Sequence, residues 1–295
     1  MKRLADRPAF WGWLFITPWL AGFLGFTAGP MLASLWLSFY KYDLVNLEYV
    51  GLENYRRLPL DPLFWKALSN TFAYAFISVP LGVAGSLMIA LLLNQKVRGI
   101  PLFRTFFYIP SLVPSVAAAI LWQWVFNAEN GALNLGLGFL GLPTPQWLQD
   151  ERFTLPAFVL MSLWGVGGAR MVIFLAGLQG ISETYYEAAR LDGASHRQQF
   201  WHVTLPLLSP VMFFNLVLGL IGAFQIFTQA YIMTGGGPNN ASLFYALYLF
   251  RTAFEQFKLG KASALAWVLF AILLVFTLIQ FRASKKWVHY EGGEA

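Results

Sequence analysis

The residues best suited to acid–base or metal chemistry gather in one charged segment, Tyr185 to Pro210, which lies between two long apolar runs. The segment carries two of the three histidines, His196 and His202. They lie six residues apart, a spacing that does not put both on one helix face as metal ligands. The chain also has no cysteine and no H-E-x-x-H pattern. We therefore expect no metal ion, no catalytic set and no cofactor bound by this chain.

A second set of small and amide residues lies inside an apolar stretch. On a continuous helix turning about 100° per residue they share an arc about 120° wide: Asn215, Gly219, Gly222, Gln225 and Gln229. One interpretation is helix packing, in which glycine allows close approach and amides bond across the interface. The other is a hydrated path that binds the hydroxyl groups of a solute, together with Trp122, Gln123 and Trp124. The sequence leaves both interpretations open.

Arg170 is the only charged residue inside a stretch that could span a membrane, which makes it a functional candidate by default. Its position, about 11 residues or roughly 17 Å from the end of that stretch, is too deep for easy snorkelling. It could bind an anionic solute or pair with a carbonyl or carboxylate at a subunit interface. We favour the structural role.

Composition indicates that much of the chain lies within a lipid membrane. Of 295 residues, 58% are hydrophobic and only 12% are charged, whereas about 25% are charged in a soluble domain. A spanning helix needs about 20 apolar residues. Six stretches predict six transmembrane helices: Pro8 to Tyr40, Ala67 to Gln95, Thr105 to Ala128, Phe153 to Ser182, Val203 to Phe250 and Ala262 to Phe281.

Two of the uncharged stretches need interpretation. "GGGPNN" (Gly235 to Asn240) interrupts the longest one, so we predict a helix ending near Met233, then an external loop with a surface helix. Asn130 to Gln149 is rich in glycine and proline, and is predicted to be an irregular loop or interfacial hairpin. The fold class is therefore an all-α, polytopic membrane protein.

The distribution of lysine and arginine orients the six helices, because cytoplasmic segments carry an excess of both. An even number of spans puts both termini on one side, and we predict that side to be the cytoplasm. Eleven basic residues would lie inside against eight outside; the inside set is Lys2, Arg3, Arg7, Lys96, Arg98, Arg104, Arg190, Arg197, Arg282, Lys285 and Lys286. The excess of basic over acidic residues is thus explained by membrane orientation, and we expect no nucleic-acid partner.

This orientation places the charged segment in a cytoplasmic loop. Ser182 is a predicted N-cap, and Gly193 is a predicted C-terminal stop for the same helix. Ser195 and Gln198 fit a capping box that begins a second helix. The small residues Ala188 and Ala189 would let the first helix approach a partner closely.

The segment "EAARLDGASHRQQFWHVTLPLLSP" resembles the EAA loop of permease subunits of binding-protein-dependent ABC importers, with Glu187, Ala188, Ala189, Gly193, Leu205 and Pro206 at the pattern positions. The similarity extends over nearly the whole chain, including "WGVGGARMVIFLAGLQGI" and "GLIGAFQIFTQAYIMTGGGPNNAS". "YVGLENYRRL" and "TGGGP" resemble the carbohydrate branch, in particular the maltose and glycerol-phosphate type of first permease subunit. Thr228 departs from the aspartate of many relatives.

This resemblance implies a single transmembrane permease domain over residues 1–295, with a coupling loop at 180–206, in a bacterial or archaeal inner membrane. The coupling helix would dock on an ATPase subunit through Glu187, Ala188, Ala189, Arg190, Leu191, Asp192 and Gly193. The family's assembly also implies a second permease subunit, two ATP-binding subunits and an external solute-binding protein. A sugar or glycerol-phosphate-like solute is implied, although the sequence does not identify which.

The chain itself lacks the phosphate-binding loop G-x-x-x-x-G-K-[ST], since Gly260-Lys261 is followed by Ala262 and has no earlier glycine. We therefore predict that it is not an enzyme, and that ATP and Mg²⁺ are used by its partners. The alternative is a secondary transporter or channel without an ATPase. Such proteins usually place a carboxylate or paired charges in the membrane, and here only Arg170 lies there.

Overall fold

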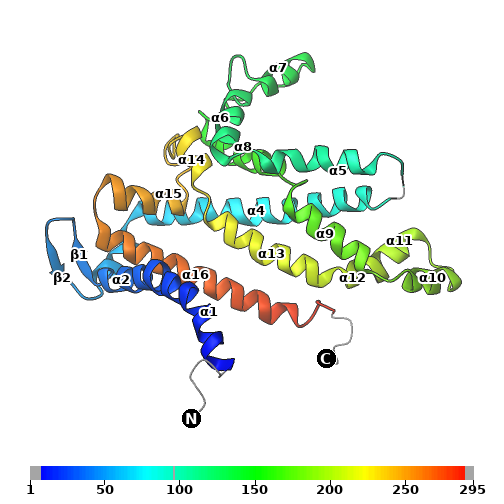
Figure 1. Ribbon diagram of the computed structural model, residues 1–295. Helices are drawn as coiled ribbons and strands as arrows, with labels where there is room; N and C mark the ends of the chain where they lie inside the picture. The colour runs from blue at the N-terminus through cyan, green and yellow to red at the C-terminus, as the bar shows by residue number, and fades with distance from the viewer. Residues whose placement is uncertain (1–7, 96, 290–295) are drawn as a thin grey trace, which may run out of the picture. The chain divides into compact units, whose positions relative to one another are not determined.

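The computed structural model describes residues 8–95 and 97–289 and is mostly helical (Figure 1). The chain divides into two compact units: Met1–Asp61 with Leu249–Ala271, and Pro62–Tyr248 with Ile272–Ala295. Part of the predicted orientation depends on Lys2, Arg3, Arg7 and Lys96, which lie outside the described residues.

The first unit begins with a long apolar helix that is a candidate membrane span over Trp11–Leu37. Its elements are α1 (Pro8–Phe23), the π-helical turn η2 (Leu24–Ala28), α2 (Gly29–Leu37), β1 (Tyr40–Tyr42), β2 (Leu47–Tyr49), α3 (Glu53–Arg57), the 3₁₀ turn η3 (Leu58–Leu60), the π-helical turn η6 (Arg251–Glu255) and the first part of α16 (Leu259–Ser284).

The two short strands form an antiparallel hairpin, with Tyr40 opposite Tyr49. Asp43 makes the turn, because its Oδ1 accepts hydrogen bonds from the backbone N–H groups of Val45 and Asn46. The bond from Asn46 is the main reason that the pKa of Asp43 lies below its ordinary value.

The start of α16 packs against this hairpin. Gly260 lies so close to the Tyr40 carbonyl oxygen that a Cβ atom there would overlap it. Beside it, the Lys261 ammonium donates to a carboxylate oxygen of Asp61 at 2.6 Å. Both side chains are about three-quarters shielded from solvent. These contacts fix where α16 begins.

The second unit contains the remaining helices. They are α4 (Pro62–Leu93), α5 (Ile100–Tyr108), the 3₁₀ turn η4 (Ile109–Leu112), α6 (Ser115–Val125), α7 (Ala132–Phe139), α8 (Glu151–Leu163), α9 (Ala169–Gly180), α10 (Glu183–Leu191), α11 (His196–Gln199), the π-helical turn η5 (Phe200–Thr204), α12 (Leu205–Leu207), α13 (Ser209–Phe224), α14 (Thr228–Met233) and most of α15 (Tyr245–Phe250).

The central element of this unit is α4, a helix of 32 residues that packs against α8, α9 and α13. Its buried face is rich in small residues, among them Ala67, Ala75, Gly82 and Ala90. Small side chains let neighbouring helices approach closely, which is how membrane helices gain packing contacts without a hydrophobic driving force. The pattern explains why α4 can contact three other helices along its length.

The observed spans are fewer than the six that we predicted. Among the described residues, four helices are long and apolar enough to cross a membrane: Trp11–Leu37, Pro62–Leu93, Ser209–Met233 and Leu259–Ser284. A fifth is obtained if Ile100–Leu112 and Ser115–Val125, bent by 95°, count as one span. The predicted span Phe153 to Ser182 is divided into α8 and α9, because the glycine-rich residues 164–168 do not continue the helix.

The prediction of a surface helix after the glycine-rich loop is wrong, because the helix found there, α15, is largely buried. Of the residues that form α15, Tyr245, Leu247 and Tyr248 are buried. The Tyr245 ring meets Phe64 edge-on, and its backbone N–H donates to Thr71 Oγ1 at 2.8 Å. A one-dimensional reading of the sequence could not detect these long-range contacts with α4.

The loop predicted between residues 130 and 149 contains the short helix α7 and a longer irregular segment. Asn134 holds it closed: the amide nitrogen donates to the carbonyl oxygens of Ala128 and Pro145, and the amide oxygen accepts from Trp147 Nε1.

We predict that Gly260→Ala lowers the free energy of unfolding by about 1–3 kcal/mol, because the new methyl group overlaps backbone rather than a movable side chain. Thermal unfolding of the purified protein in detergent measures this. The control is Gly22→Ala, where a Cβ atom meets nothing within 4 Å. This second change should be neutral or stabilising, since alanine favours helix more than glycine does. Equal melting temperatures for wild type and Gly260→Ala would contradict the packing described.

Candidate functional site

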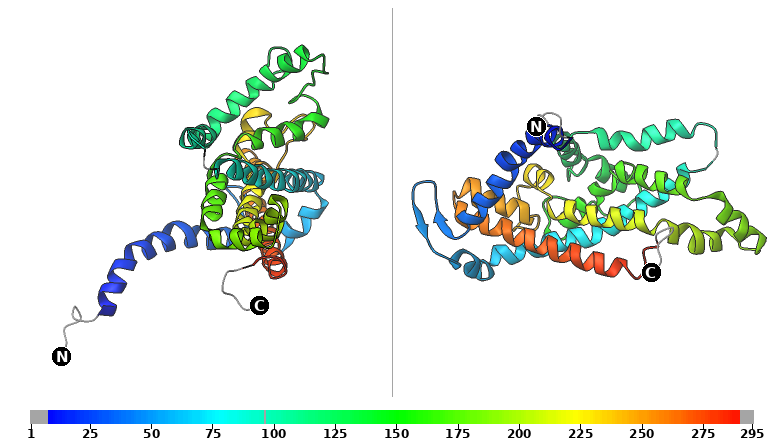
Figure 2. Two further views of the ribbon diagram at one scale, coloured as in Figure 1. Left: turned by 90° about the vertical axis from the view of Figure 1, so that its right-hand side faces the viewer. Right: turned by 60° about the horizontal axis from the view of Figure 1, so that its bottom comes forward.

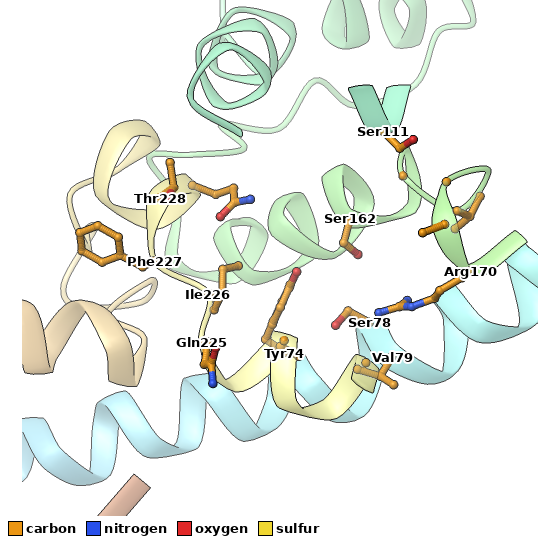
Figure 3. A pocket seen from close by; sticks show the side chains of 18 residues that line it. Tyr74, Ser78, Val79, Ser111, Ser162, Arg170, Gln225, Ile226, Phe227 and Thr228 are labelled. Carbon is orange, nitrogen blue, oxygen red and sulfur yellow. The ribbon is translucent and has the colours of Figure 1, made fainter. Parts of the chain in front are cut away.

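A cavity of about 470 Å³ lies in the second unit where two helices are interrupted. It is lined from α4, η4, α8, α9, α13 and α14 and includes the irregular residues between α8 and α9 and between α13 and α14. Its volume falls in the range of small-molecule sites. Figure 3 shows the polar side chains that converge on it.

The break between α8 and α9 is held by packing that only glycine permits. Ser86 Oγ on α4 donates to the Val166 carbonyl oxygen at 2.7 Å, which satisfies a backbone group that the broken helix leaves free. A Cβ on Gly167 would collide with the Phe107 carbonyl, and one on Gly168 would approach Ser111 Cβ to 2.8 Å. The "GVGG" sequence therefore keeps this turn beside the cavity.

The second break lies between α13 and α14, within the predicted set of small and amide residues. Their shared arc assumed one continuous helix, but α13 ends at Phe224 and α14 begins at Thr228. Gln225 and Gln229 both line the cavity, as do Gly219 and Gly222. Asn215 does not line it: this buried side chain donates to the Val211 carbonyl oxygen of its own helix at 2.9 Å.

The three candidates on the third predicted span lie outside the cavity lining. Gln123 Nε2 donates to the Met233 carbonyl oxygen at 3.4 Å and so joins α6 to the end of α14. Trp122 stacks at an angle on Phe126 and meets Trp164 edge-on. Trp124 is exposed on the surface of the unit.

The cavity brings together polar residues that the sequence analysis did not single out. Tyr74 and Ser78 are one helical turn apart on α4 and are buried. Figure 3 shows the Tyr74 hydroxyl turned toward Ser162 of α8 and the Arg170 guanidinium beside Ser78. The i, i+4 spacing of Tyr74 and Ser78 was the only available signal, and it also fits ordinary helix packing.

Arg170, the second residue of α9, extends into a gap between α4 and α13. A Cβ atom on Gly82 would lie 2.6 Å from its Nη1, and a Cβ atom on Gly219 would lie 3.1 Å from its Nη2. Two glycines thus make the space that the guanidinium occupies. Among the described residues, no carboxylate forms an ion pair with Arg170.

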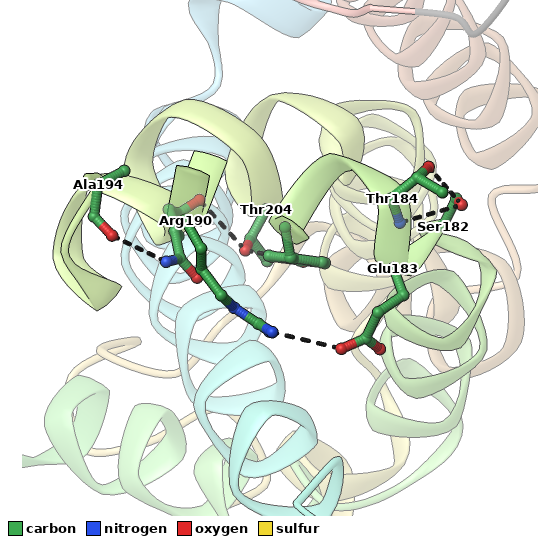
Figure 4. A network of polar contacts seen from close by, with 8 residues as sticks. Ser182, Glu183, Thr184, Arg190, Ala194 and Thr204 are labelled. Atoms are coloured by element: carbon green, nitrogen blue, oxygen red, sulfur yellow. Dashed lines mark hydrogen bonds and ion pairs between the residues drawn. The ribbon is translucent and has the colours of Figure 1, made fainter. Parts of the chain in front are cut away.

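The charged loop forms the helix, turn and helix that its sequence predicted (Figure 4). Ser182 caps α10, and the Ser195–Gln198 capping box begins α11. Gly193 has φ +79°, and Ala194 N–H donates to the Ala189 carbonyl oxygen, which closes a Schellman motif. These local predictions are confirmed.

The loop is tied to the helices behind it while its tip stays free. The hydroxyl groups of Tyr186 and Thr204 lie 3.0 Å apart, and buried Gln199 donates to the Ala194 carbonyl oxygen at 2.9 Å. On the outer side, Glu187, Ala188 and Asp192 are exposed, and Leu191 is 90% exposed. Arg190 and Glu183 form an exposed ion pair at 3.4 Å.

Figures 1 and 2 show α10 and α11 at the end of the second unit where α4 ends and α13 begins. The end of the described chain reaches the same place, since His289 N–H donates to Ser209 Oγ at 2.8 Å. The turn before α15 lies at the other end of α4, where Asn70 Nδ2 donates to the Asn240 carbonyl oxygen. The loop and the C-terminal end of α16 therefore lie on one side.

Within residues 8–95 and 97–289 no group of three or more His, Cys, Asp and Glu residues could hold a metal ion, and this search includes His196 and His202.

Residues 82–288 match the family model described as "Binding-protein-dependent transport system inner membrane component". The probable ABC transporter permease protein YesP of Bacillus subtilis is 45% identical over 96% of this chain and 93% of its own length. The trehalose/maltose transport system permease protein MalF of Thermococcus litoralis is 33% identical over 96% of this chain and 97% of its own length.

The fold is also that of a chain in the crystal structure of a bacterial alginate ABC transporter in complex with an alginate pentasaccharide-bound periplasmic protein. The TM-score is 0.85 at 21% identity, covering 97% of this chain and 98% of that one.

We predict that Tyr186→Phe speeds hydrogen exchange in the α10–α11 loop by about 3- to 10-fold, because one net hydrogen bond of about 0.5–1.5 kcal/mol is lost. Hydrogen–deuterium exchange with mass spectrometry measures the effect. Tyr185→Phe is the matched control, since Tyr185 is exposed on the same helix. The same exchange rate in both variants would show that the Tyr186–Thr204 contact does not hold the loop.

Proposed function

The chain belongs to the family of binding-protein-dependent transport system inner membrane components, and we propose that it is the permease subunit of an ATP-driven sugar importer. The exposed, doubly capped α10 is the observation that carries the proposal, because it presents a docking helix at one end of a helical unit that encloses a polar cavity. The names of relatives that transport trehalose and maltose, lactose or several sugars support a carbohydrate as the solute.

Six spans form the membrane domain in this proposal. To the four long helices and the bent pair we add α8 and α9 as one interrupted span of 13 and 12 residues. Non-helical backbone at membrane depth is tolerated where it lines a cavity, and residues Gly165, Val166 and Gly168 of the interruption do so. Both termini lie in the cytoplasm, on the side of α10.

Coupling to ATP hydrolysis is assigned to Glu187 through Gly193. The exposed alanine and leucine of α10 supply apolar contact, and the neighbouring charges of Glu187, Arg190 and Asp192 supply orientation. Two ATP-binding subunits, a second permease subunit and an external solute-binding protein complete the assembly in a bacterial or archaeal plasma membrane. The ATPase subunits use ATP and Mg²⁺, and this chain contributes the path for the solute.

A secondary transporter or channel is the competing function. It would not need α10 to be exposed, and a change there would leave transport intact.

We predict that Glu187→Lys reduces solute-stimulated ATP hydrolysis of the assembled transporter at least about tenfold, because truncating or reversing one charge at a docking contact costs several kcal/mol. Glu129→Lys, the same charge reversal in an exposed loop outside α10, is the control. Hydrolysis and ATP-driven uptake are measured in proteoliposomes with all subunits. Uptake that survives Glu187→Lys unchanged, or that needs no ATPase subunit, would support the competing function.

We also predict that Gln225→Ala and Gln229→Ala each raise the KM for sugar uptake, by about 5- to 10-fold, because each loses a hydrogen bond to a hydroxyl of the solute. Asn215→Ala is the contrast, since Asn215 bonds its own helix and lies outside the cavity lining. Its KM should stay at the wild-type value. Wild-type KM and rate in both glutamine variants would remove them from the solute path.

A further inference from the structure

We propose that the cavity binds a solute carrying one carboxylate, such as a uronic acid residue, and that Arg170 is the group that pairs with it. The inference rests on the proposed function only in taking the ligand to be a carbohydrate. The observations that carry it are the cavity, the lack of an ion pair to Arg170 among the described residues, and the two glycines beside its guanidinium.

The charge of Arg170 has no counter-ion on any element that lines the cavity. The lining helices α4, α9, α13 and α14 contain no aspartate or glutamate, and neither does the turn η4. On α8 the one acidic residue is Glu151, eleven residues from the lining residue Ser162, or about 17 Å along the helix. A cation at membrane depth is costly unless an anion or several acceptors face it.

Contacts with two neighbouring helices fix the position of the Arg170 guanidinium. Gly82 and Gly219 lie on two different helices, and each leaves room at one of the two terminal nitrogens of Arg170. Both terminal nitrogens are therefore set beside the cavity, with Ser78 alongside (Figure 3). A guanidinium offers a carboxylate two parallel N–H donors, which is the geometry of its strongest pairing.

The rest of the lining fits a polyol. Tyr74, Ser78, Ser162 and Thr228 bring hydroxyl groups, and Gln225 and Gln229 bring amides, all of which can donate to or accept from sugar hydroxyls. A phosphate ester carries about 1.5 to 2 negative charges and three acceptor oxygens. Arg170 is the only cationic side chain in the lining, so the cavity matches the single charge of a carboxylate better than it matches a phosphate.

The test measures binding to the permease complex in nanodiscs without the solute-binding protein, so that selection by that protein does not enter. The probes are radiolabelled galacturonate and glucuronate, each beside its methyl ester, which has the same ring and no charge. Equilibrium dialysis gives the ratio of the two affinities. We expect wild type to prefer the free acid by about 10- to 100-fold, and Arg170→Gln to bring the ratio close to one.

Two further variants separate a pairing role from a purely structural one. Arg170→Lys keeps the charge without the two-donor geometry and should keep part of the preference. In Gly82→Ala the new methyl group should displace the movable end of Arg170 rather than the helix, and so lower the preference while the complex stays folded. Arg152→Gln, which removes an exposed arginine outside the cavity lining, should leave the ratio unchanged.

A wild-type ratio near one, no binding of either probe, or an unchanged ratio in Arg170→Gln would each overturn the inference. The first and third results would instead favour the structural role, in which Arg170 pairs with a carbonyl or carboxylate at a subunit interface. ATP-driven uptake of galacturonate and of a neutral sugar is measured in parallel, in proteoliposomes with all subunits and the solute-binding protein. Uptake of the neutral sugar alongside a ratio of one would leave the importer function intact, and uptake of neither solute alongside a clear binding preference would reject only the importer.

Discussion

Lipid offers no hydrogen bonds to a protein backbone, so each interruption of a membrane helix must be satisfied from within the protein. This constraint explains how the second unit is built. The interruption between α8 and α9 is closed by a serine of α4 and packed by glycines against α5 and η4. The interruption between α13 and α14 lies on the same cavity. The irregular backbone thus lies where protein and polar space, rather than lipid, surround it.

In the second unit, helices α9 and α13 connect the α10–α11 loop with the cavity. From the loop at one end, α13 extends 16 residues, or about 24 Å, to the cavity. On the other side of the loop, α9 runs from the cavity back to the cap of α10. The loop is anchored at both of its ends by side-chain contacts, including Tyr186 to Thr204. A partner that moved α10 would therefore act on helices α9 and α13, which lead to the cavity, rather than on irregular chain.

The parts of the structure that the sequence predicted well are local ones. Ser182, Gly193 and the Ser195–Gln198 pair act within a few residues of themselves, so their roles follow from residue type and spacing alone. The errors came from long-range contacts. Hydropathy could not detect that α8 and α9 are separate, or that Tyr245 is buried against α4. The cavity joins Tyr74, Ser162 and Gln229 from three distant segments, and their joint position depends on helix packing that no single stretch encodes.

The glycine gap around Arg170 also bears on how such a protein changes over generations. Gly82 lies against the movable tip of the arginine, whereas Gly167 lies against backbone. The fold excludes a side chain at Gly167, because a Cβ atom there would overlap the backbone of Phe107. An alanine at Gly82 is tolerated, because its methyl group displaces the Arg170 guanidinium rather than a helix. With the pairing proposed for Arg170, solute preference can diversify through Gly82, a residue that is not itself part of the cavity lining.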